Sequence, residues 1–408
     1  MRNIAIGIAA CLLQACLCGQ LSAQVPDETV PENARRAGPV RFLPAIVFAG
    51  PGVDTNVFDQ YDQPRQDWTA RVAPKSDWWM RMGRGSLTAY TTLEYVHFAK
   101  YESQRSLNGE VKAKLAVSLG HFIPYLSAGY LSTRDRPGYE IDVRARRIED
   151  GAAVGSDFRI SSRMTIGAWG SRSQLRYDEA DQFLGTSLAR ALNRVTTGWH
   201  AEARRRVMSL TTVLVRAEGL QDRFDTSHYK DADSVSVKPG IQFKPAALLK
   251  GEALVGYRSF RPLNPLVPEF KGLVASLELA WVHSATRIGV RMSRDIEYSF
   301  VPTEPYYLLT DIAPIITQMI TRNWDVSAGA AWQRLAYEVL ATPGGTTLPG
   351  AGRTDKGFRA AAGFGRSFGD TLRIGFEASY YERRSLYPGL ASYEKLLAGV
   401  SVRYGLKP

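Results

Sequence analysis

Apolar and polar positions alternate along most of the chain, in segments of about ten residues. In residues 107–119 the odd-numbered positions are apolar or glycine, and most even-numbered positions are polar. Residues 235–244, 249–258 and 372–380 alternate in the same way. A period of two places the apolar side chains on one face of a strand, whereas a helix would space them by three and four. The pattern therefore predicts β-strands throughout residues 41–408.

The length and the polar face of these strands distinguish a membrane barrel from a soluble sandwich. Strands of about ten residues match the 9–11 needed to cross a bilayer at a tilt and exceed the 5–6 usual in soluble sheets. The polar face carries full charges in strand after strand, which a packed core could not solvate. No apolar run is long enough for a spanning helix. Because backbone polar groups in hydrocarbon must be paired internally, the strands must close into a barrel.

The connections between the strands alternate between long and short. The long, polar ones are residues 51–66, 99–104, 132–140, 178–188, 221–232, 261–269, 297–304, 338–353 and 383–391. The short ones are residues 83–85, 120–121, 161–162, 205–208, 245–247, 283–285, 321–322 and 369–370. Outer-membrane barrels have long external loops and short periplasmic turns. We therefore predict an all-β fold, a transmembrane, antiparallel, up-and-down β-barrel of about 18 strands (range 16–18).

Aromatic residues near the strand ends are candidates for the girdles that flank the apolar belt of such barrels. They are Trp68, Trp78, Phe98, Phe122, Tyr125, Tyr177, Phe260, Phe270, Trp281 and Trp324.

The N-terminal residues predict a secretory signal peptide over residues 1–23. A positive residue is followed by an apolar stretch at 4–13 and by a Leu-Ser-Ala cleavage site. All three cysteines lie in this segment, so the mature chain would have no disulfide and no thiolate ligand. An alternative interpretation is that Cys16 is lipidated. Residues 24–40 are polar and proline-containing and predict a periplasmic linker before the barrel of residues 41–408, in the outer membrane of a bacterium.

The polar face of the strands is predicted to line the lumen of the barrel. Its basic residues are Lys112, Lys114, Arg194, Arg204, Lys238, Lys244, Lys250, Arg258, Arg287, Arg291, Arg359, Arg373 and Arg403, and its acidic residues are Glu110, Glu202, Glu252, Glu278 and Glu377. The formal net charge is +11. A basic wall surrounded by low dielectric concentrates anions, so we expect a preference for anionic solutes. The alternative is that charges of opposite sign pair with one another and leave no selectivity.

At about 18 strands the lumen is wide enough for an aqueous channel unless loops fold into it. The loop at 338–353 is long and rich in glycine and proline, and it could enter the lumen. Such loops usually remain outside, so we expect this one to do the same.

Other functional classes find little support in the sequence. The basic charge is spread over many strands without a recognition motif, which argues against nucleic-acid binding. No motif with metal-ligand or nucleophile spacing occurs in the barrel, so we predict no metal, no cofactor and no catalytic residue. His200 and Glu202 share one strand face, as a base and its orienting acid would in a hydrolase at the barrel rim. The favoured interpretation is a histidine in a polar lumen, and we expect no enzymatic activity.

The first strand and loop contain the sequence Gly-Val-Asp-Thr-Asn-Val-Phe at residues 52–58. Its Asp54, Asn56 and Phe58 resemble the opening motif of the second family of outer-membrane beta-barrel porins, and residues 294–335 are similar to a later part of that family. The resemblance implies a porin-like barrel. Members of the family often lie near exopolysaccharide gene clusters, which implies a part in exopolysaccharide export across the outer membrane.

The alternative is a general diffusion porin for small, preferentially anionic solutes, and a third possibility is a lipid hydrolase at the barrel rim or a structural partner. The partners expected with a barrel of this family are outer-membrane lipids, the barrel-assembly machinery, an anionic polysaccharide and a periplasmic polysaccharide-export protein.

Overall fold

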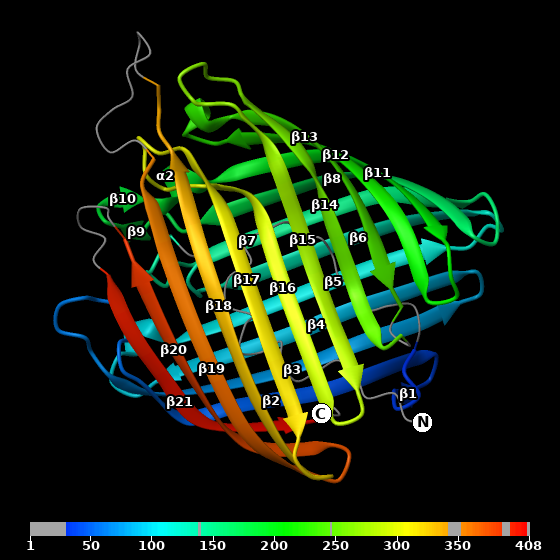
Figure 1. Ribbon diagram of the computed structural model, residues 1–408, viewed down its shortest axis with the longest axis horizontal. Helices are drawn as coiled ribbons and strands as arrows, with labels where there is room; N and C mark the ends of the chain where they lie inside the picture. Colours follow the sequence, from blue (N-terminus) through cyan, green and yellow to red (C-terminus); the bar gives the residue numbers. More distant parts are fainter. Residues whose placement is uncertain (1–29, 138–139, 245–246, 342–351, 386–391, 406–408) are drawn as a thin grey trace.

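The computed structural model describes residues 30–137, 140–244, 247–341, 352–385 and 392–405. In these residues the chain forms a closed antiparallel barrel of 18 strands (Figure 1). The strands are β2 (Val40–Asp54), β3 (Asp67–Met82), β4 (Gly85–Phe98), β5 (Ser106–Val117), β6 (Phe122–Thr133), β7 (Arg147–Arg159), β8 (Met164–Tyr177), β11 (Arg194–Arg206), β12 (Thr211–Phe224), β13 (Ala232–Phe243), β14 (Leu249–Pro262), β15 (Phe270–His283), β16 (Thr286–Tyr298), β17 (Tyr306–Met319), β18 (Trp324–Glu338), β19 (Thr354–Phe368), β20 (Leu372–Arg384) and β21 (Tyr393–Tyr404). Each strand pairs with the next, and β2 also pairs with β21, which closes the barrel.

This architecture confirms the predicted fold class, the strand number and the alternation of long and short connections. The barrel strands begin at Val40 and end at Tyr404, and both of these residues lie at the short-turn end, paired with Met80 and Leu372. The proposed signal peptide lies outside the described residues. Part of the stretch expected to be a linker forms strand β1 (Arg35–Ala37), which pairs with the start of β2.

The first barrel strand extends further than the sequence indicated. Pro51 and Gly52 were expected to begin the first long loop, but they lie inside β2, where the register against β3 and β21 shifts. Gly50 has a φ of 136°, and a Cβ at this position would lie 2.8 Å from the Cα of Ala70. Only glycine fits this bulge, which allows the strand to continue to Asp54.

Burial alternates along the strands as a membrane barrel requires. Leu107, Val111 and Leu115 of β5 are 61%, 49% and 38% exposed, while the polar residues between them are less exposed. The exposed apolar side chains form the outer surface, and the residues of opposite parity face inward.

Among the aromatics expected in the girdles, Trp68, Trp78, Phe122 and Trp281 are exposed. Phe98, Tyr177 and Phe260 are instead buried and cannot face lipid. They lie near the long-loop ends of their strands, where connecting segments pack over them.

The long connections contain short elements of their own. They are η1 (Glu102–Gln104), β9 (Gln182–Phe183), β10 (Thr186–Ser187), α2 (Leu188–Leu192) and η2 (His228–Lys230). Figure 1 shows β9, β10 and α2 at the end of the barrel opposite to β1. In the described part of the chain, no helix is long and apolar enough to cross a membrane.

Candidate functional site

The connection between β6 and β7 lies inside the barrel rather than above it. We call its described residues, 134–137 and 140–146, the inner segment. Its Glu140, Asp142 and Arg144 are 2%, 7% and 4% exposed, and Ile141 and Ala145 are equally buried. Surface loops keep their charged side chains in water. Burial of three charged residues in one loop therefore shows that the loop is enclosed by the barrel wall and the other connections.

Strands β20 and β21 hold one side of the inner segment. Arg383 of β20 forms an ion pair with the Asp142 carboxylate and donates a hydrogen bond to the Glu140 carbonyl at 2.8 Å. Tyr393 of β21 donates its hydroxyl to Asp142 at 2.8 Å. Strands β2–β5 separate β6 from β21 in the barrel wall. The inner segment therefore reaches through the lumen to these partners.

A second anchor comes from the connection between β16 and β17. The Glu140 carboxylate accepts hydrogen bonds from the Ser299 hydroxyl at 2.6 Å and from the Phe300 N–H at 3.0 Å. In the wall, β8 and β11–β15 lie between β7 and β16, and the rest of the barrel lies on the other side. With anchors on both sides, the inner segment crosses the long-loop mouth of the barrel.

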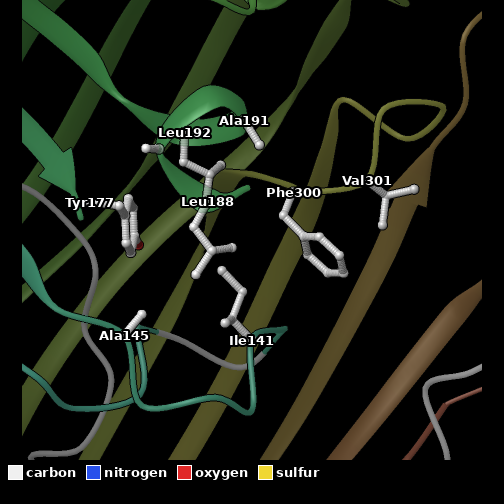
Figure 2. Close-up of a cluster of buried hydrophobic side chains, with 9 residues drawn as sticks. Ile141, Ala145, Tyr177, Leu188, Ala191, Leu192, Phe300 and Val301 are labelled. Carbon is white, nitrogen blue, oxygen red and sulfur yellow. The ribbon is translucent and has the colours of Figure 1, made fainter. Parts of the chain in front are cut away.

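An apolar contact holds the third side of the inner segment (Figure 2). Leu188 of α2 lies between Tyr177 and Phe300, and Ile141 of the inner segment completes the cluster. The helix begins at Ser187, whose side chain accepts a hydrogen bond from the Arg190 N–H. Sequence alternation did not predict this helix: the long connection was placed at residues 178–188, and residues 189–192 were expected to belong to the next strand. The helix brings Leu188 and Leu192 into the buried cluster beside the inner segment.

Lys230 of η2 fastens α2 to the β16–β17 connection. Its ammonium group donates to the carbonyls of Ala191 at 3.2 Å and Ser299 at 2.6 Å, and the side chain is buried. Burial lowers the pKa of Lys230 to about 8.

The residues of the family-like motif, Asp54, Asn56 and Phe58, lie next to the inner segment and bind the first long loop to its neighbours. The Asn56 amide donates to the carbonyls of Gln60 at 2.7 Å and Glu394 at 3.1 Å, which ties the first loop to β21. Lys395 lies 2.9 Å from the carboxylate of Asp54. The Phe58 ring packs edge-on against Tyr101, with centroids 4.9 Å apart. The motif residues thus fix the loop.

The same loop holds the inner segment through one further carboxylate. Asp59 forms ion pairs with Lys395 at 3.1 Å and with Arg136 of the inner segment at 2.5 Å. The motif predicted from the sequence therefore contributes indirectly to holding the inner segment in the mouth, because it positions Asp59.

The predicted lumen residues lie, with one exception, on strand faces opposite to the exposed apolar side chains. They are Lys112, Lys114, Glu110 (β5), Arg194, Arg204, Glu202 (β11), Lys238 (β13), Lys250, Arg258, Glu252 (β14), Glu278 (β15), Arg287, Arg291 (β16), Arg359 (β19), Arg373, Glu377 (β20) and Arg403 (β21). The exception is Lys244, which follows the last residue of β13 and is exposed at a turn.

Many of these charges are paired with one another or with acids that were not singled out from the sequence. Arg204 lies 2.6 Å from Asp157, and Arg373 lies 2.6 Å from Asp325. Arg403 lies 2.5 Å from Glu377. Pairing of opposite charges, the alternative considered for the sequence, therefore describes much of the wall.

Glu218 of β12 is the centre of a network of charges on the wall. Its carboxylate lies 2.6 Å from Lys238 and 2.7 Å from Arg258 and accepts a hydrogen bond from Ser236 at 2.9 Å. Glu218 was not predicted, although Val213, Val215, Ala217 and Gly219 alternate around it and the same period of two indicates that it faces inward.

Two basic residues near the short-turn end differ from this pattern. Lys250 and Arg287 lie close enough to repel each other electrostatically. Neither forms an ion pair within the part of the chain that the structure describes.

The profile of a protein family described as "Putative beta-barrel porin 2" matches residues 35–405. The chain belongs to this porin family. This confirms the resemblance inferred from Asp54, Asn56 and Phe58, and it places the protein in the outer membrane. No curated protein matches the chain.

Several solved structures are similar to this porin. The outer membrane protein OpdK from Pseudomonas aeruginosa is 12% identical, with 89% of this chain and 97% of that chain covered and a TM-score of 0.49. A mutant of the ferric enterobactin receptor PfeA from Pseudomonas aeruginosa is 8% identical, with 91% and 81% covered and a TM-score of 0.44. A bacterial polysaccharide outer membrane secretin is 11% identical, with 89% and 98% covered and a TM-score of 0.38.

His200, singled out from the sequence, has polar and aromatic neighbours in the porin other than Glu202. His200 Nε2 lies 3.0 Å from Ser171 Oγ, and Nδ1 lies 3.7 Å from Glu218, while the ring stacks on Trp169. Glu202 instead pairs with Arg204 and Arg216. The His200–Glu202 pair that a hydrolase would need, the disfavoured alternative, does not form, because Glu202 is held by two guanidinium groups. No cluster of metal ligands occurs among the described residues.

The buried Glu140 makes docking of the inner segment across the porin mouth sensitive to pH. Burial raises the pKa of the Glu140 carboxyl to about 7, although Ser299, Phe300, Arg353 and Arg383 favour its charged form. The docked segment therefore retains a proton that the released segment would lose above its ordinary pKa of 4.5. Docking is most favourable at acidic pH and weakens as the pH rises through 7.

We expect single-channel conductance to increase as the pH is raised from about 5 to 7.5, the window set by this raised pKa. Glu140→Gln, which keeps an acceptor for Ser299 but cannot ionise, is expected to flatten the profile. Glu102→Gln, in an exposed loop, is the control and should leave the profile unchanged. An unchanged slope in Glu140→Gln would contradict this assignment.

Proposed function

We propose that this barrel is a porin for small, preferentially anionic solutes. The observation that carries the proposal is the inner segment, which crosses the mouth and is fixed on both sides through Asp142 and Glu140. The inner segment in this position divides a lumen that the 18 strands would otherwise leave wide. The remaining passage suits small solutes better than a bulky chain.

The preference for anions rests on the unbalanced charges near the short-turn end. Most charged pairs of the wall offset each other, but Lys250 and Arg287 have no carboxylate partner among the described side chains. In a water-filled lumen with low-dielectric walls, unpaired cations raise the local concentration of anions.

Reversal potentials under a potassium chloride gradient test this proposal. We expect the purified barrel to favour chloride, and Lys250→Glu/Arg287→Glu to move the reversal potential toward cation preference. Lys271→Glu, on the outer face of β15, reverses an equivalent charge outside the lumen and should have little effect. Cation preference of the unaltered barrel would overturn the proposed selectivity.

Exopolysaccharide export is the second candidate, and the family resemblance is what supports it. Export of a polymer would require the inner segment to leave the mouth, and it would involve the expected anionic polysaccharide and a periplasmic polysaccharide-export protein. A clean deletion in the native host separates the two proposals. Loss of secreted polymer with accumulation in the periplasm would favour export, whereas normal polymer with reduced uptake of small anions would favour the diffusion porin.

We also propose that the barrel has no hydrolase activity. Glu218, the acid nearest to His200, is already engaged by Lys238 and Arg258, which supports a structural role for the Ser171–His200 contact. Labelling of Ser171 by a fluorophosphonate probe would contradict this proposal. As partners we propose bacterial outer-membrane lipids and the barrel-assembly machinery that inserts such barrels.

A further inference from the structure

Four basic residues occupy one row on five neighbouring strands. Arg294 of β16 is opposite Thr310 of β17, and Thr310 is opposite Arg334 of β18. Arg334 is opposite Lys356 of β19, and Lys356 is opposite Arg384 of β20. We call Arg294, Arg334, Lys356 and Arg384 the outer basic row. Residues directly opposed on adjacent strands have Cβ atoms about 5 Å apart.

The outer basic row belongs to the outer surface of the barrel. Its members share strand parity with Ile288, Ile312, Trp332 and Phe364, which are 40%, 38%, 50% and 47% exposed. Arg334, Lys356 and Arg384 are themselves exposed, and Arg294 is half-buried. These side chains therefore point away from the lumen and cannot contribute to its selectivity.

The charges of this row are poorly balanced by the protein. Arg294 donates to the Leu273 carbonyl at 3.2 Å and to the Thr310 hydroxyl at 3.1 Å, both of which are neutral. Arg384 pairs with Glu382 of its own strand. Arg334 and Lys356 form no ion pair in the described residues. Like charges directly opposed across strands are destabilising, and a bound anion would relieve that repulsion.

The row stands at the edge of the apolar belt. The next outward row toward the middle of the barrel contains Met292, Ile312, Trp332 and Phe358, which are successive register partners. The Trp332 and Phe358 rings have centroids 5.8 Å apart. Aromatic side chains of membrane barrels gather where hydrocarbon meets headgroups. The outer basic row lies on the long-loop side of these rings, at the level of the headgroups of the outer leaflet.

We propose that the outer basic row binds the phosphate groups of a glycolipid in the outer leaflet. Guanidinium groups recognise phosphate with two parallel hydrogen bonds, and an ammonium group adds a point charge. Arg334, Lys356 and Arg384 extend over about 10 Å, two strand spacings, so one headgroup with two phosphates can contact all three. The site goes beyond the proposed transport function, because it attaches a particular lipid to β18–β20.

Native mass spectrometry of the full-length barrel in a neutral detergent tests the site. The probe is bisphosphorylated lipid A, compared with dephosphorylated lipid A of the same acyl chains. We expect the unaltered barrel to retain the phosphorylated lipid, and Arg334→Gln/Lys356→Gln to bind it at least about tenfold more weakly, since each basic residue near a charged surface contributes about 1 kcal/mol. Arg334→Lys/Lys356→Arg keeps both charges and should retain most of the binding.

The control is Arg223→Gln on the outer face of β12, where Asp233 lies 2.7 Å from the guanidinium. It removes an outward charge at the same end of the barrel and should not change lipid retention. All variants should keep the wild-type conductance, which shows that they are folded. Equal retention by the double glutamine variant, or equal binding of the dephosphorylated lipid, would overturn the proposal. Displacement by millimolar inorganic phosphate would also overturn it, in favour of a site for the free ion.

Discussion

Replacing Arg383 with alanine is expected to raise the single-channel conductance of the barrel several-fold. Arg383 is 2% exposed and neutralises Asp142 of the inner segment and Asp355 of β19. Without it, Asp142 would be buried without its guanidinium partner. Leaving an uncompensated charge in such a place costs about 3–5 kcal/mol. The segment can avoid this cost by moving into water, which opens the mouth.

Two further variants make this expectation specific. Arg384→Ala removes a guanidinium from the next residue of the same strand, which faces outward, and it should leave the conductance unchanged. Asp142→Asn in the Arg383→Ala background removes the uncompensated carboxylate, so we expect the conductance to return toward the wild-type value. If Arg383→Ala folds and conducts like the unaltered barrel, the inner segment does not depend on this ion pair.

Replacing Glu218 with alanine is expected to produce the largest loss of stability among substitutions of the lumen wall. The substitution leaves Lys238, Arg258 and His200 around an empty position, with the charge of Lys238 no longer offset and that of Arg258 offset in part. Arg258 retains an ion pair with Asp295 at 3.1 Å and a hydrogen bond to the Ser234 hydroxyl at 3.5 Å. We expect a loss of about 3–5 kcal/mol, seen as a lower temperature at which the compact barrel band disappears in gels with sodium dodecyl sulfate.

Glu278→Ala is the matched control for the stability measurement. Glu278 faces the same lumen from β15 but is exposed there, so its removal should shift the transition little. A combined Glu218→Ala/Lys238→Met variant also removes the cation left without a carboxylate and should recover part of the loss. Equal transition temperatures for Glu218→Ala and Glu278→Ala would show that the network contributes no net stability.

The barrel was predictable from the sequence because the alternation of apolar and polar residues that defines each strand lies within that strand. Each strand must be apolar on the lipid side, so side chains such as Leu107 and Val111 report their orientation directly. The strand number was predictable for a similar reason. Each polar connection can be recognised from its own residues, and counting the connections gives the number of strands.

The position of the inner segment across the mouth depends on contacts that no local sequence pattern contains. The inner segment has the composition of an exposed loop, and it is buried because partners far away in the chain hold it, such as Arg383, which neutralises Asp142 from 241 positions away. An external loop was predicted here at residues 132–140, with the next strand to follow; the connection instead continues to residue 146 and lies in the mouth of the barrel. Most of loop 338–353, the other candidate for entering the lumen, lies outside the described residues, although its last residue, Arg353, is buried near Glu140.

The anchors of the inner segment also set an order of events during assembly. Its partners Ser299 and Tyr393 follow it by 159 and 251 positions, and Tyr393 belongs to the strand that closes the barrel against β2. The contact with Tyr393 cannot form before this last strand is in place. The inner segment is therefore held on both sides only in a barrel whose wall is complete.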